Sequence, residues 1–276
     1  LLPALLVKPK NKAQVAQLLA YCNSHGLSIV TQGGLTGLSG GATPQKGEVA
    51  LSLERLVGIT EVDAQSMTLT ALAGTPLATI QQAALDAGLR LPLDLGARGS
   101  CTIGGNVSTN AGGNQVLSFG MTRSLVLGLE AVLANGEVVR SMNKMLKNNA
   151  GYDIKQLFIG SEGTLGVVTE VVLRLYPIAI TKHSAWCAFE SFNDVCHFLT
   201  QMQTQLGRVT AFELMWRNYI DAVLQLHPQM KNPLQKNHPL YVLIEAEGNN
   251  ASVDGEHFQN VLATALESGY LVDAVF

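Results

Sequence analysis

The stretch Gln32-Gly33-Gly34-Leu35-Thr36-Gly37-Leu38-Ser39-Gly40-Gly41 contains five glycines in ten positions. It follows a predicted strand, Leu27 to Thr31, and that strand follows a predicted helix that Asn11 caps and Gly26 ends. Glycine allows positive φ and close backbone approach, so consecutive N–H groups can converge on an anion. The stretch therefore predicts a phosphate-binding loop with pyrophosphate as its natural ligand. The alternative is a mobile surface loop, which Leu35 and Leu38 disfavour as apolar anchors.

Two common nucleotide-binding folds lack their signatures in this chain. No Gly-x-Gly triplet occurs anywhere, so the Rossmann fingerprint Gly-x-Gly-x-x-Gly is absent. Neither Gly-Lys-Ser nor Gly-Lys-Thr occurs, so a P-loop would lack its lysine and its Mg²⁺-binding hydroxyl. Binding of NAD by a Rossmann fold and hydrolysis of ATP by a P-loop are both disfavoured.

The composition favours a protein that binds a small molecule. The 276 residues are 47% hydrophobic and 14% charged, with a net charge of −3 and no basic stripe that would capture nucleic acid. The length predicts two domains, and no apolar run approaches the ~20 residues of a membrane span. Homodimerisation and peripheral membrane association are left open.

The four cysteines include no Cys-x-x-Cys pair and are too sparse for a disulfide framework or a zinc site. We therefore expect no metal and a reducing compartment. The expected location is the cytoplasm, and peripheral association with the inner membrane is left open. The chain begins Leu1-Leu2-Pro3 without an initiator methionine. From this we expect a fragment of a longer protein.

The residues after the loop predict an α/β opening followed by an antiparallel sheet. Predicted strands at 48–52, 58–62 and 68–73 precede a helix from Thr75-Pro76 to Gly88. Residues 91–113 are too irregular for an element and too apolar for a linker, which predicts a buried loop. Asn135-Gly136 predicts a hairpin between strands at 125–134 and 137–140, and 166–175 forms a further strand.

A change of composition near 178–182 predicts a boundary between a first domain, residues 1–178, and a second, residues 179–276. In the second domain, strands around Trp186, Ala211 and Tyr241 alternate with helices at 193–206, 217–227 and 252–268. Its last predicted strand, 270–276, stops at the end of the chain with nothing to close it. We therefore expect an incomplete α+β domain.

A second glycine-rich cluster extends over Pro92-Leu93-Asp94-Leu95-Gly96-Ala97-Arg98-Gly99-Ser100-Cys101-Thr102-Ile103-Gly104-Gly105-Asn106-Val107-Ser108-Thr109-Asn110-Ala111-Gly112-Gly113. Small residues, apolar residues and side-chain amides occur together in it, a mixture that suits a flat polar heterocycle buried against backbone. Taken alone, a tight loop packed on a sheet explains this cluster equally well. Its pairing with the first loop favours the ligand.

A third cluster comprises Lys147-Asn148-Asn149-Ala150-Gly151-Tyr152-Asp153 and Phe158-Ile159-Gly160-Ser161-Glu162-Gly163-Thr164-Leu165-Gly166-Val167-Val168. In this order, the three clusters resemble the FAD-linked oxidases and dehydrogenases of the vanillyl-alcohol oxidase type. The resemblance is to the branch of D-lactate dehydrogenase, the glycolate oxidase D subunit and D-2-hydroxyglutarate dehydrogenase, and it covers about residues 4 to 176. Three matched clusters are far more specific than one.

The resemblance implies an α+β fold. Its PCMH-type FAD-binding domain has a small α/β part and a larger, mainly antiparallel sheet with helices, and an incomplete ferredoxin-like cap domain follows. It places the loop at 33–41 on the pyrophosphate, residues 92–112 along the isoalloxazine and ribityl chain, and 162–168 at the adenosine half. The implied FAD-binding residues are Gly33, Gly34, Leu35, Thr36, Gly37, Leu38, Gly40, Gly41, Pro92, Gly99, Ser100, Cys101, Gly104, Gly105, Asn106, Ser108, Ala111, Gly112, Glu162, Gly163, Val167 and Val168.

The implied activity is oxidation of a 2-hydroxy acid of the D-lactate, glycolate or D-2-hydroxyglutarate type. Hydride passes to FAD, and electrons continue to a quinone, a cytochrome or an electron-transfer flavoprotein. Relatives that bind FAD covalently through the first loop carry a histidine near the position of Leu35 or Thr36, and this chain has none there. Non-covalent FAD is therefore expected. Alternatives are a flavin enzyme of the same fold for another alcohol or a sugar nucleotide, and a non-catalytic FAD-binding subunit.

No catalytic residue is assigned, because the family takes its substrate-binding cation and its base largely from cap residues beyond this chain. Glu213 could orient such a cation, although a surface carboxylate at a strand end is the commoner interpretation. His227, His238 and His257 lack ligand spacing and are expected at the solvated surface. The cysteines are treated as small apolar residues, with Cys101 near the flavin.

Overall fold

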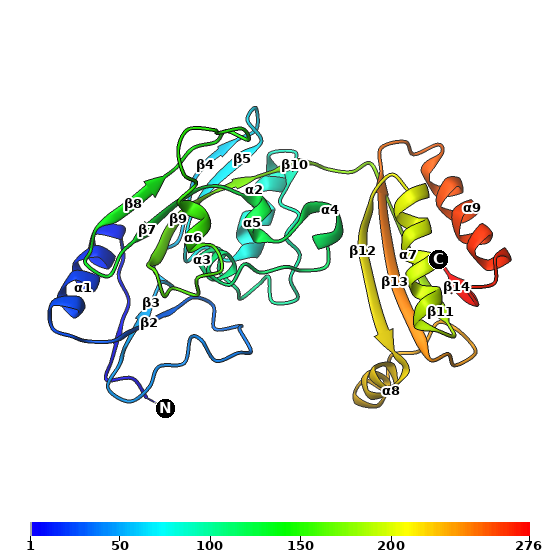
Figure 1. Cartoon of the computed structure of the whole chain (residues 1–276), viewed down its shortest axis with the longest axis horizontal. Coiled ribbons are helices and arrows are strands. Elements are labelled where there is room, and N and C mark those ends of the chain that lie inside the picture. The colour runs from blue at the N-terminus through cyan, green and yellow to red at the C-terminus, as the bar shows by residue number, and fades with distance from the viewer. Residues whose placement is uncertain (1) are drawn as a thin grey trace. The chain divides into compact units, whose positions relative to one another are not determined.

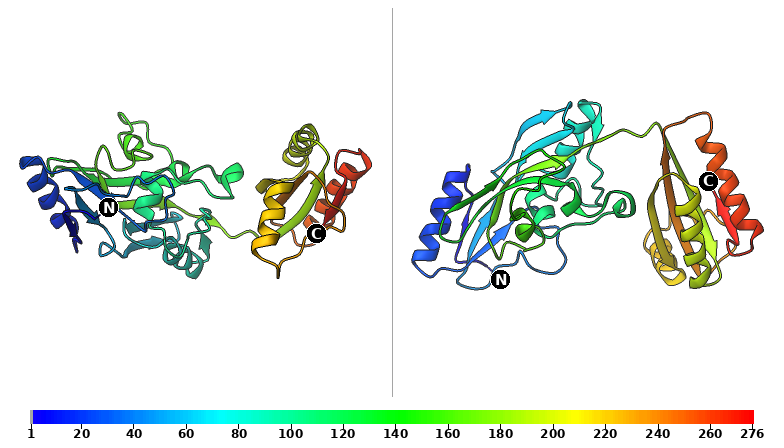
Figure 2. Two further views of the ribbon diagram at one scale, coloured as in Figure 1. Left: turned by 90° about the horizontal axis from the view of Figure 1, so that it is seen from below. Right: turned by 45° about the horizontal axis from the view of Figure 1, so that its top comes forward.

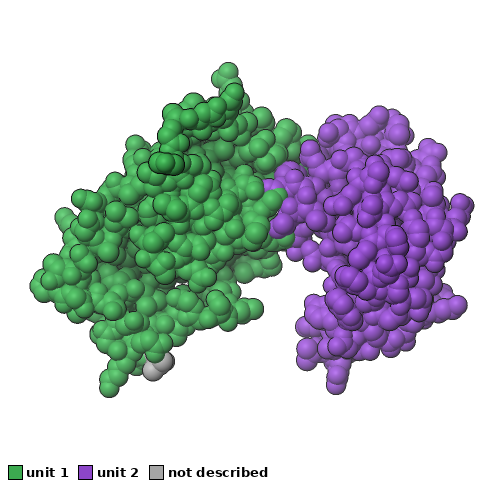
Figure 3. All heavy atoms as spheres, in the orientation of Figure 1, with its two compact units in different colours: residues 1–113, 120–178 green, residues 114–119, 179–276 purple. Residues whose placement is uncertain are grey.

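The computed structural model describes residues 2–276, and its chain forms two compact units. The first unit contains residues 1–113 and 120–178, and the second contains residues 114–119 and 179–276. Figure 3 shows the first unit in green and the second in purple. Each has its own sheets and core, so each is described by itself.

The first unit opens with a small parallel sheet. Its strands are β1 (Leu5–Val7), β3 (Val49–Ser52) and β2 (Ile29–Gln32), in the order β1-β3-β2. Helix α1 (Lys12–Ser24) connects β1 to β2, and the Asn11 side chain caps it by accepting a hydrogen bond of 3.0 Å from the Gln14 N–H. The predicted α/β opening is confirmed, and β2 ends directly at the glycine-rich loop.

The larger sheet of this unit is antiparallel throughout, in the order β4-β5-β9-β7-β8 (Figure 1). The central strand β9 is buried along nearly its whole length, as its run of apolar and β-branched residues predicts. The predicted hairpin at Asn135-Gly136 joins β7 to β8, with Gly136 at φ +86°. The strands are β4 (Ile59–Asp63), β5 (Thr68–Leu72), β7 (Val126–Val132), β8 (Val138–Ser141) and β9 (Val167–Arg174).

Residues 91–113 were predicted to be a buried loop without an element, and this prediction is wrong in two respects. Helix α3 (Ile103–Ser108) lies inside the segment, and residues 96–100 are exposed. The helix is held against β5 because the Gly104 N–H donates to the Ala73 carbonyl at 2.8 Å. A Cβ at Gly104 would lie 2.6 Å from the Ala73 Cβ, so only glycine permits this approach.

Four more helices and a short ladder complete the description of residues 77–177. The ladder pairs β6 (Leu89–Arg90) with β10 (Tyr176–Pro177). Helix α2 follows β5, α5 leads into β7, and α6 precedes β9. The helices are α2 (Leu77–Asp86), α4 (Val116–Phe119), α5 (Thr122–Leu125) and α6 (Lys155–Phe158).

An ionic cluster ties α1 to the large sheet. Glu130 on β7 and Glu170 on β9 are register neighbours and are 4% and 6% exposed. The Lys12 ammonium lies 3.0 Å from a Glu130 oxygen and 2.8 Å from a Glu170 oxygen. Arg140 also contacts Glu130, at 3.1 Å. Lys12 therefore joins two carboxylates that would otherwise repel each other across the strands.

The second unit is a four-stranded antiparallel sheet in the order β12-β13-β11-β14. Its strands are β11 (Thr181–Phe189), β12 (Val209–Trp216), β13 (Leu240–Gly248) and β14 (Asp273–Val275), and its longer helices are α7 (Phe192–Gln205), α8 (Arg217–Leu226) and α9 (Asp254–Glu267). Apart from α8, this is the β-α-β-β-α-β succession of a ferredoxin-like fold. Strand β14 pairs with β11 at the edge of the sheet.

Both faces of this sheet carry apolar residues. Helices α7 and α9 lie side by side on one face (Figures 1 and 2), where Cys187 and Phe189 belong to the main core. Ala188 and Tyr241 belong to a smaller cluster with Ile220 of α8. Successive side chains of a strand point to opposite faces, so α8 packs on the other side. Helix α4 joins this unit through Ser118, whose hydroxyl donates to the Val209 carbonyl at 2.6 Å.

The histidines only partly follow the expectation of a solvated surface. His227 and His257 are exposed. His238 is 6% exposed, and its ring Nδ1 lies 2.9 Å from a Glu190 carboxylate oxygen. The backbone N–H of His238 donates to the Tyr241 hydroxyl at 2.9 Å. The prediction for His238 is wrong because the partly buried loop 231–239 folds back onto Tyr241, a contact that local spacing does not reveal.

The cysteines differ sharply in accessibility, which predicts a labelling pattern. Cys22, Cys101 and Cys187 are buried, and Cys196 on α7 is exposed. Burial raises the pKa of the Cys187 thiol to about 12, and burial also raises the pKa of Cys22 and Cys101. We expect a thiol reagent at neutral pH to label Cys196 alone in the folded chain and all four after denaturation, as peptide mass spectrometry would show. Rapid labelling of Cys187 in the folded chain would contradict the structure.

Candidate functional site

The glycine-rich loop offers a row of unused backbone donors. Among residues 2–276, no backbone N–H from Gly34 to Ala42 donates to a protein acceptor. The Gln32 side chain closes the base of the loop by donating to the Ala42 carbonyl at 2.9 Å. Backbone donors without protein partners around a hollow are what an anion requires.

The apolar residues of the loop do not act as anchors. Leu35 is 63% exposed and Leu38 is 103% exposed, so the predicted packing role is wrong for both. Leu35 also has φ +56°, an uncommon conformation for a side chain with a Cβ. The loop is positioned instead by glycines that pack on the second cluster.

Two of these glycines allow the first and second clusters to touch. A Cβ at Gly34 would overlap the Ser100 carbonyl oxygen and lie 2.8 Å from the Cys101 Cα. A Cβ at Gly33 would meet the Thr102 hydroxyl. The loop backbone therefore lies directly against the turn that begins α3.

The third cluster closes the other side of the site. The Glu162 N–H donates to the Ser108 carbonyl at 2.8 Å and the Gly160 N–H donates to the Val107 carbonyl at 3.0 Å, which ties this turn to the end of α3. Glu162 and Gly163 both have positive φ, at 53° and 79°. A Cβ at Gly41 would lie 3.1 Å from a Glu162 carboxylate oxygen, so this turn faces the loop.

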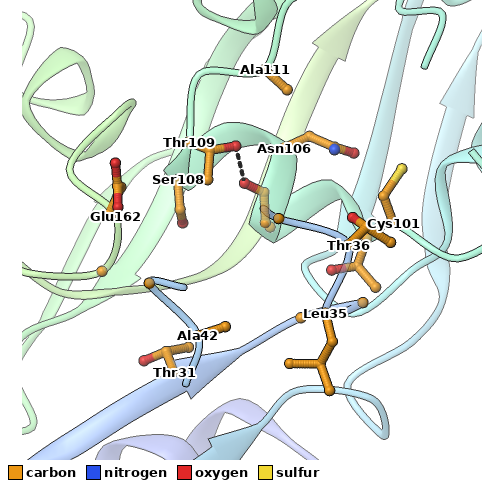
Figure 4. A pocket seen from close by; sticks show the side chains of 18 of the residues that line it. Thr31, Leu35, Thr36, Ala42, Cys101, Asn106, Ser108, Thr109, Ala111 and Glu162 are labelled. Carbon is orange, nitrogen blue, oxygen red and sulfur yellow. Dashed lines mark hydrogen bonds between the residues drawn. The ribbon is translucent and has the colours of Figure 1, made fainter. Parts of the chain in front are cut away.

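The three clusters enclose a cavity of about 380 Å³, within the range of roughly 300–1,000 Å³ for small-molecule sites. Figure 4 shows Glu162 and Ser108 on one side of it, Leu35, Thr36 and Cys101 on the other, and Thr31 and Ala42 below. The lining residues are Thr31, Gly33, Gly34, Leu35, Thr36, Gly37, Ser39, Gly41, Ala42, Leu53, Leu95, Gly96, Ala97, Cys101, Thr102, Gly104, Gly105, Asn106, Ser108, Thr109, Ala111, Glu162, Gly163, Val167 and Val168.

Most of the predicted cofactor-binding residues line this one cavity, although their contact with a cofactor stays a prediction. The predicted residues outside its lining are Leu38, Gly40, Pro92, Gly99, Ser100 and Gly112. The lining residues that the sequence analysis missed are Thr31, Ser39, Ala42, Leu53, Leu95, Gly96, Ala97, Thr102 and Thr109. Ser39, Ala42, Thr102 and Thr109 adjoin a predicted residue in sequence. Leu53 directly follows β3, which only the parallel pairing with β2 brings close.

The cavity wall contains polar atoms that the protein leaves unpaired. The Thr102 hydroxyl and the Asn106 side-chain oxygen are both buried and have no hydrogen-bond partner. Such atoms are rare in native proteins and are usually explained by a ligand, an ion or water. Together with the free loop donors, they fit a ligand that has an anionic part and a polar heterocycle.

The second unit contributes two observations on the remaining candidates. Glu213 lies within β12 and not at a strand end, and partial burial raises the pKa of its carboxyl group. Among the described residues, no three His, Cys, Asp or Glu side chains converge as a metal site would require. In the same part of the chain, every helix is too short or too polar to span a bilayer.

Comparisons with known proteins agree with this site. The model of the FAD binding domain family matches residues 3–141, and the model of the C-terminal domain of FAD linked oxidases matches residues 180–276. The mitochondrial D-2-hydroxyglutarate dehydrogenase of Arabidopsis thaliana is 40% identical over 98% of this chain and 49% of its own length. That of Rattus norvegicus is 40% identical over 97% of this chain and 50% of its own length. This chain therefore spans about half the length of these relatives.

A solved structure of alkyldihydroxyacetonephosphate synthase has a TM-score of 0.76 to this chain at 20% identity, covering 98% of this chain and 51% of that one. At that identity the likeness shows the fold. The two dehydrogenases are named as mitochondrial proteins, so the predicted cytoplasmic location is wrong and these names point to mitochondria instead. The error arose because cysteine usage reports a reducing environment and not an organelle.

Proposed function

This chain belongs to the FAD binding domain family, and FAD is the cofactor that its sequence predicts. From that premise we propose a more specific role. It forms the flavin-binding part of a dehydrogenase that oxidises a 2-hydroxy acid of the D-2-hydroxyglutarate, D-lactate or glycolate type. The observation that carries the proposal is the cavity lined by the glycine-rich loop, whose N–H groups have no acceptor among the described residues, by α3 and by the Glu162 turn.

Each wall of the cavity has a separate task in this proposal. The loop N–H groups hold the pyrophosphate, since converging backbone donors bind phosphate oxygens without any side chain. The α3 segment, with its glycines and its unpaired polar atoms, accepts the flat ring. The turn at Glu162 and Gly163 borders the adenosine half. These residues would hold and orient the cofactor when it is bound.

The flavin supplies the hydride chemistry when it is bound, and the protein supplies position and proton transfer. The 2-hydroxy acid requires a cation for its carboxylate and a base for its hydroxyl proton. Both are expected from residues beyond those in the cavity wall. Electrons continue to a quinone, a cytochrome or an electron-transfer flavoprotein.

The bound FAD is expected to be non-covalent. Among the described residues, no histidine and no cysteine besides Cys101 line the cavity. The Cys101 thiol is a weak nucleophile because burial raises its pKa. Acid precipitation of the loaded chain should leave all the flavin in the supernatant, as absorbance of both fractions would show. Flavin retained in the precipitate would contradict this expectation.

The activity is tested in two stages. Titration of the flavin-free chain with FAD, followed by quenching of flavin fluorescence, should give saturable binding, and its absence would end the proposal. The full-length protein, loaded with FAD without oxygen, should then lose its oxidised-flavin absorbance on addition of D-2-hydroxyglutarate, D-lactate or glycolate. Reduction only by another alcohol or a sugar nucleotide would favour a different flavin enzyme of the same fold. Resistance to every donor would favour a non-catalytic FAD-binding subunit.

A further inference from the structure

Arg123 on α5 holds the end of α6 with its guanidinium group. One terminal nitrogen, Nη1, donates to the Gln156 carbonyl and to the Gln156 side-chain Oε1, each at 2.8 Å. The other, Nη2, donates to the Ile159 carbonyl. Carbonyl groups at the end of a helix lack partners within the helix, so these bonds satisfy acceptors that α6 leaves open. The planar guanidinium group can do this because it presents donors on separate nitrogens, whereas lysine has one.

The main chain around Arg123 is attached to the end of α3. The Arg123 N–H donates to Asn110 Oδ1 at 2.9 Å, and the Thr122 hydroxyl donates to the Ala111 carbonyl at 2.6 Å. Asn110 and Ala111 lie just after α3, and Ala111 lines the cavity. Arg123 therefore connects this part of the cavity wall to the segment that leads into the Glu162 turn.

The turn that follows Ile159 has a conformation that needs support. Gly160, Glu162 and Gly163 all have positive φ, at 83°, 53° and 79°. A glutamate rarely adopts this conformation, which persists where the surrounding contacts enforce it. Hydrogen bonds from the N–H groups of Gly160 and Glu162 to the end of α3 provide part of that support. Arg123 adds an attachment at Ile159, the residue directly before the turn.

Arg123 is an exposed residue and is not among the described residues that line the cavity. Any effect that it has on a ligand must therefore pass through the turn, of which Glu162 and Gly163 line the cavity. We propose that Arg123 is a positioning residue for cofactor binding. Its guanidinium group fixes the turn 160–163 against the end of α3 and so holds one wall of the cavity in place. The inference rests on the proposed function where it concerns FAD, but the order of the turn can be measured without a ligand.

The test compares three variants with the wild-type chain. Arg123→Met removes the guanidinium group and keeps an unbranched side chain, and Arg123→Lys keeps the positive charge without the fork. Arg217→Met is the matched control, because it makes the same change at an exposed arginine of the second unit that pairs with Asp221 on its own helix. Hydrogen–deuterium exchange of the flavin-free chain is followed in peptides that cover the turn 160–163 and strand β9. Quenching of flavin fluorescence then gives the dissociation constant for FAD.

Arg123→Met should accelerate exchange in the turn by roughly tenfold and leave β9 unchanged, since losing a hydrogen bond from a charged donor favours local opening by about that factor. It should also weaken FAD binding by roughly tenfold for the same reason. Arg123→Lys should show similar changes in both measurements, because one ammonium group does not replace the fork. Arg217→Met should behave as the wild type does.

Four results would overturn the inference. Unchanged exchange of the turn in Arg123→Met would show that the guanidinium group does not hold it. Equal acceleration in the turn and in β9 would show that Arg123 supports the whole unit. Faster exchange of the turn with unaltered affinity for FAD would remove the positioning role, and full recovery in Arg123→Lys would assign the effect to charge. Failure of the wild type to bind FAD would instead remove the proposed function and leave the exchange result standing.

Discussion

Replacing Gly34 by alanine is expected to weaken FAD binding by roughly 5- to 150-fold, because overpacking costs of ~1–3 kcal/mol act directly on the loop. The added Cβ would overlap the Ser100 carbonyl oxygen and lie 2.8 Å from the Cys101 Cα. Both are backbone atoms and cannot rotate away. The loop would therefore separate from the start of α3, and its free N–H groups would be displaced from the cavity wall.

Gly207→Ala is the control for Gly34→Ala. Gly207 lies in the second unit, has no atom within 4 Å of an added Cβ and does not have positive φ. It is also absent from the cavity lining. Its replacement should leave the dissociation constant for FAD unchanged within about threefold, as a compatible Gly→Ala change acts mainly on the unfolded chain. If fluorescence titration shows equal losses for the two variants, the contact between loop and α3 is not what positions the loop.

Lys12→Met is expected to reduce the free energy of unfolding by roughly 2–3 kcal/mol. Removing one partner of a fully buried ion pair costs about 3–5 kcal/mol. We expect a smaller loss of roughly 2–3 kcal/mol here, because the Lys12 side chain is 36% exposed and solvent partly screens its charge. The variant leaves Glu130 and Glu170 side by side, with Arg140 contacting only Glu130. Urea unfolding followed by circular dichroism measures the change.

The pH dependence of this difference has a definite sign. Burial by itself lowers the pKa of Lys12, but hydrogen bonds to Glu170 and Glu130 outweigh it and raise the pKa above the ordinary value of 10.5. A raised pKa means that the folded state holds the proton more tightly than the unfolded state. The contribution of Lys12 is therefore complete at neutral pH and is lost only in the alkaline range, as the pH rises through the raised value.

Lys8→Met provides the comparison for Lys12→Met. Lys8 pairs with Glu54 at 2.7 Å, but both side chains are exposed, at 39% and 54%. Such surface pairs contribute about 0–1 kcal/mol. A loss as large for Lys8→Met as for Lys12→Met would show that general surface charge, and not the cluster on β7 and β9, accounts for the effect.

Local patterns in the sequence determined a large part of this protein. Glycine spacing between 33 and 41 marked the loop because no other residue type supplies positive φ and close approach so freely. The hairpin at Asn135-Gly136 and the apolar strand at 167–174 were also local signals. The absence of a Gly-x-Gly triplet excluded the Rossmann fingerprint, since that motif is itself a local geometry. The order of three clusters then identified the family.

Tertiary structure decided what depends on contacts between distant residues. Helix α3 was missed because its glycine-rich sequence has low helix propensity, and it forms where Gly104 packs on Ala73. Lys12 and its two carboxylates are more than a hundred residues apart, so no sequence window contains them. His238 is buried by a loop that folds onto Tyr241. Leu35 and Leu38 are exposed because glycine contacts, and not apolar anchors, position the loop. Sequence thus determined which segments form the site, and packing decided which of their atoms remain free for a ligand.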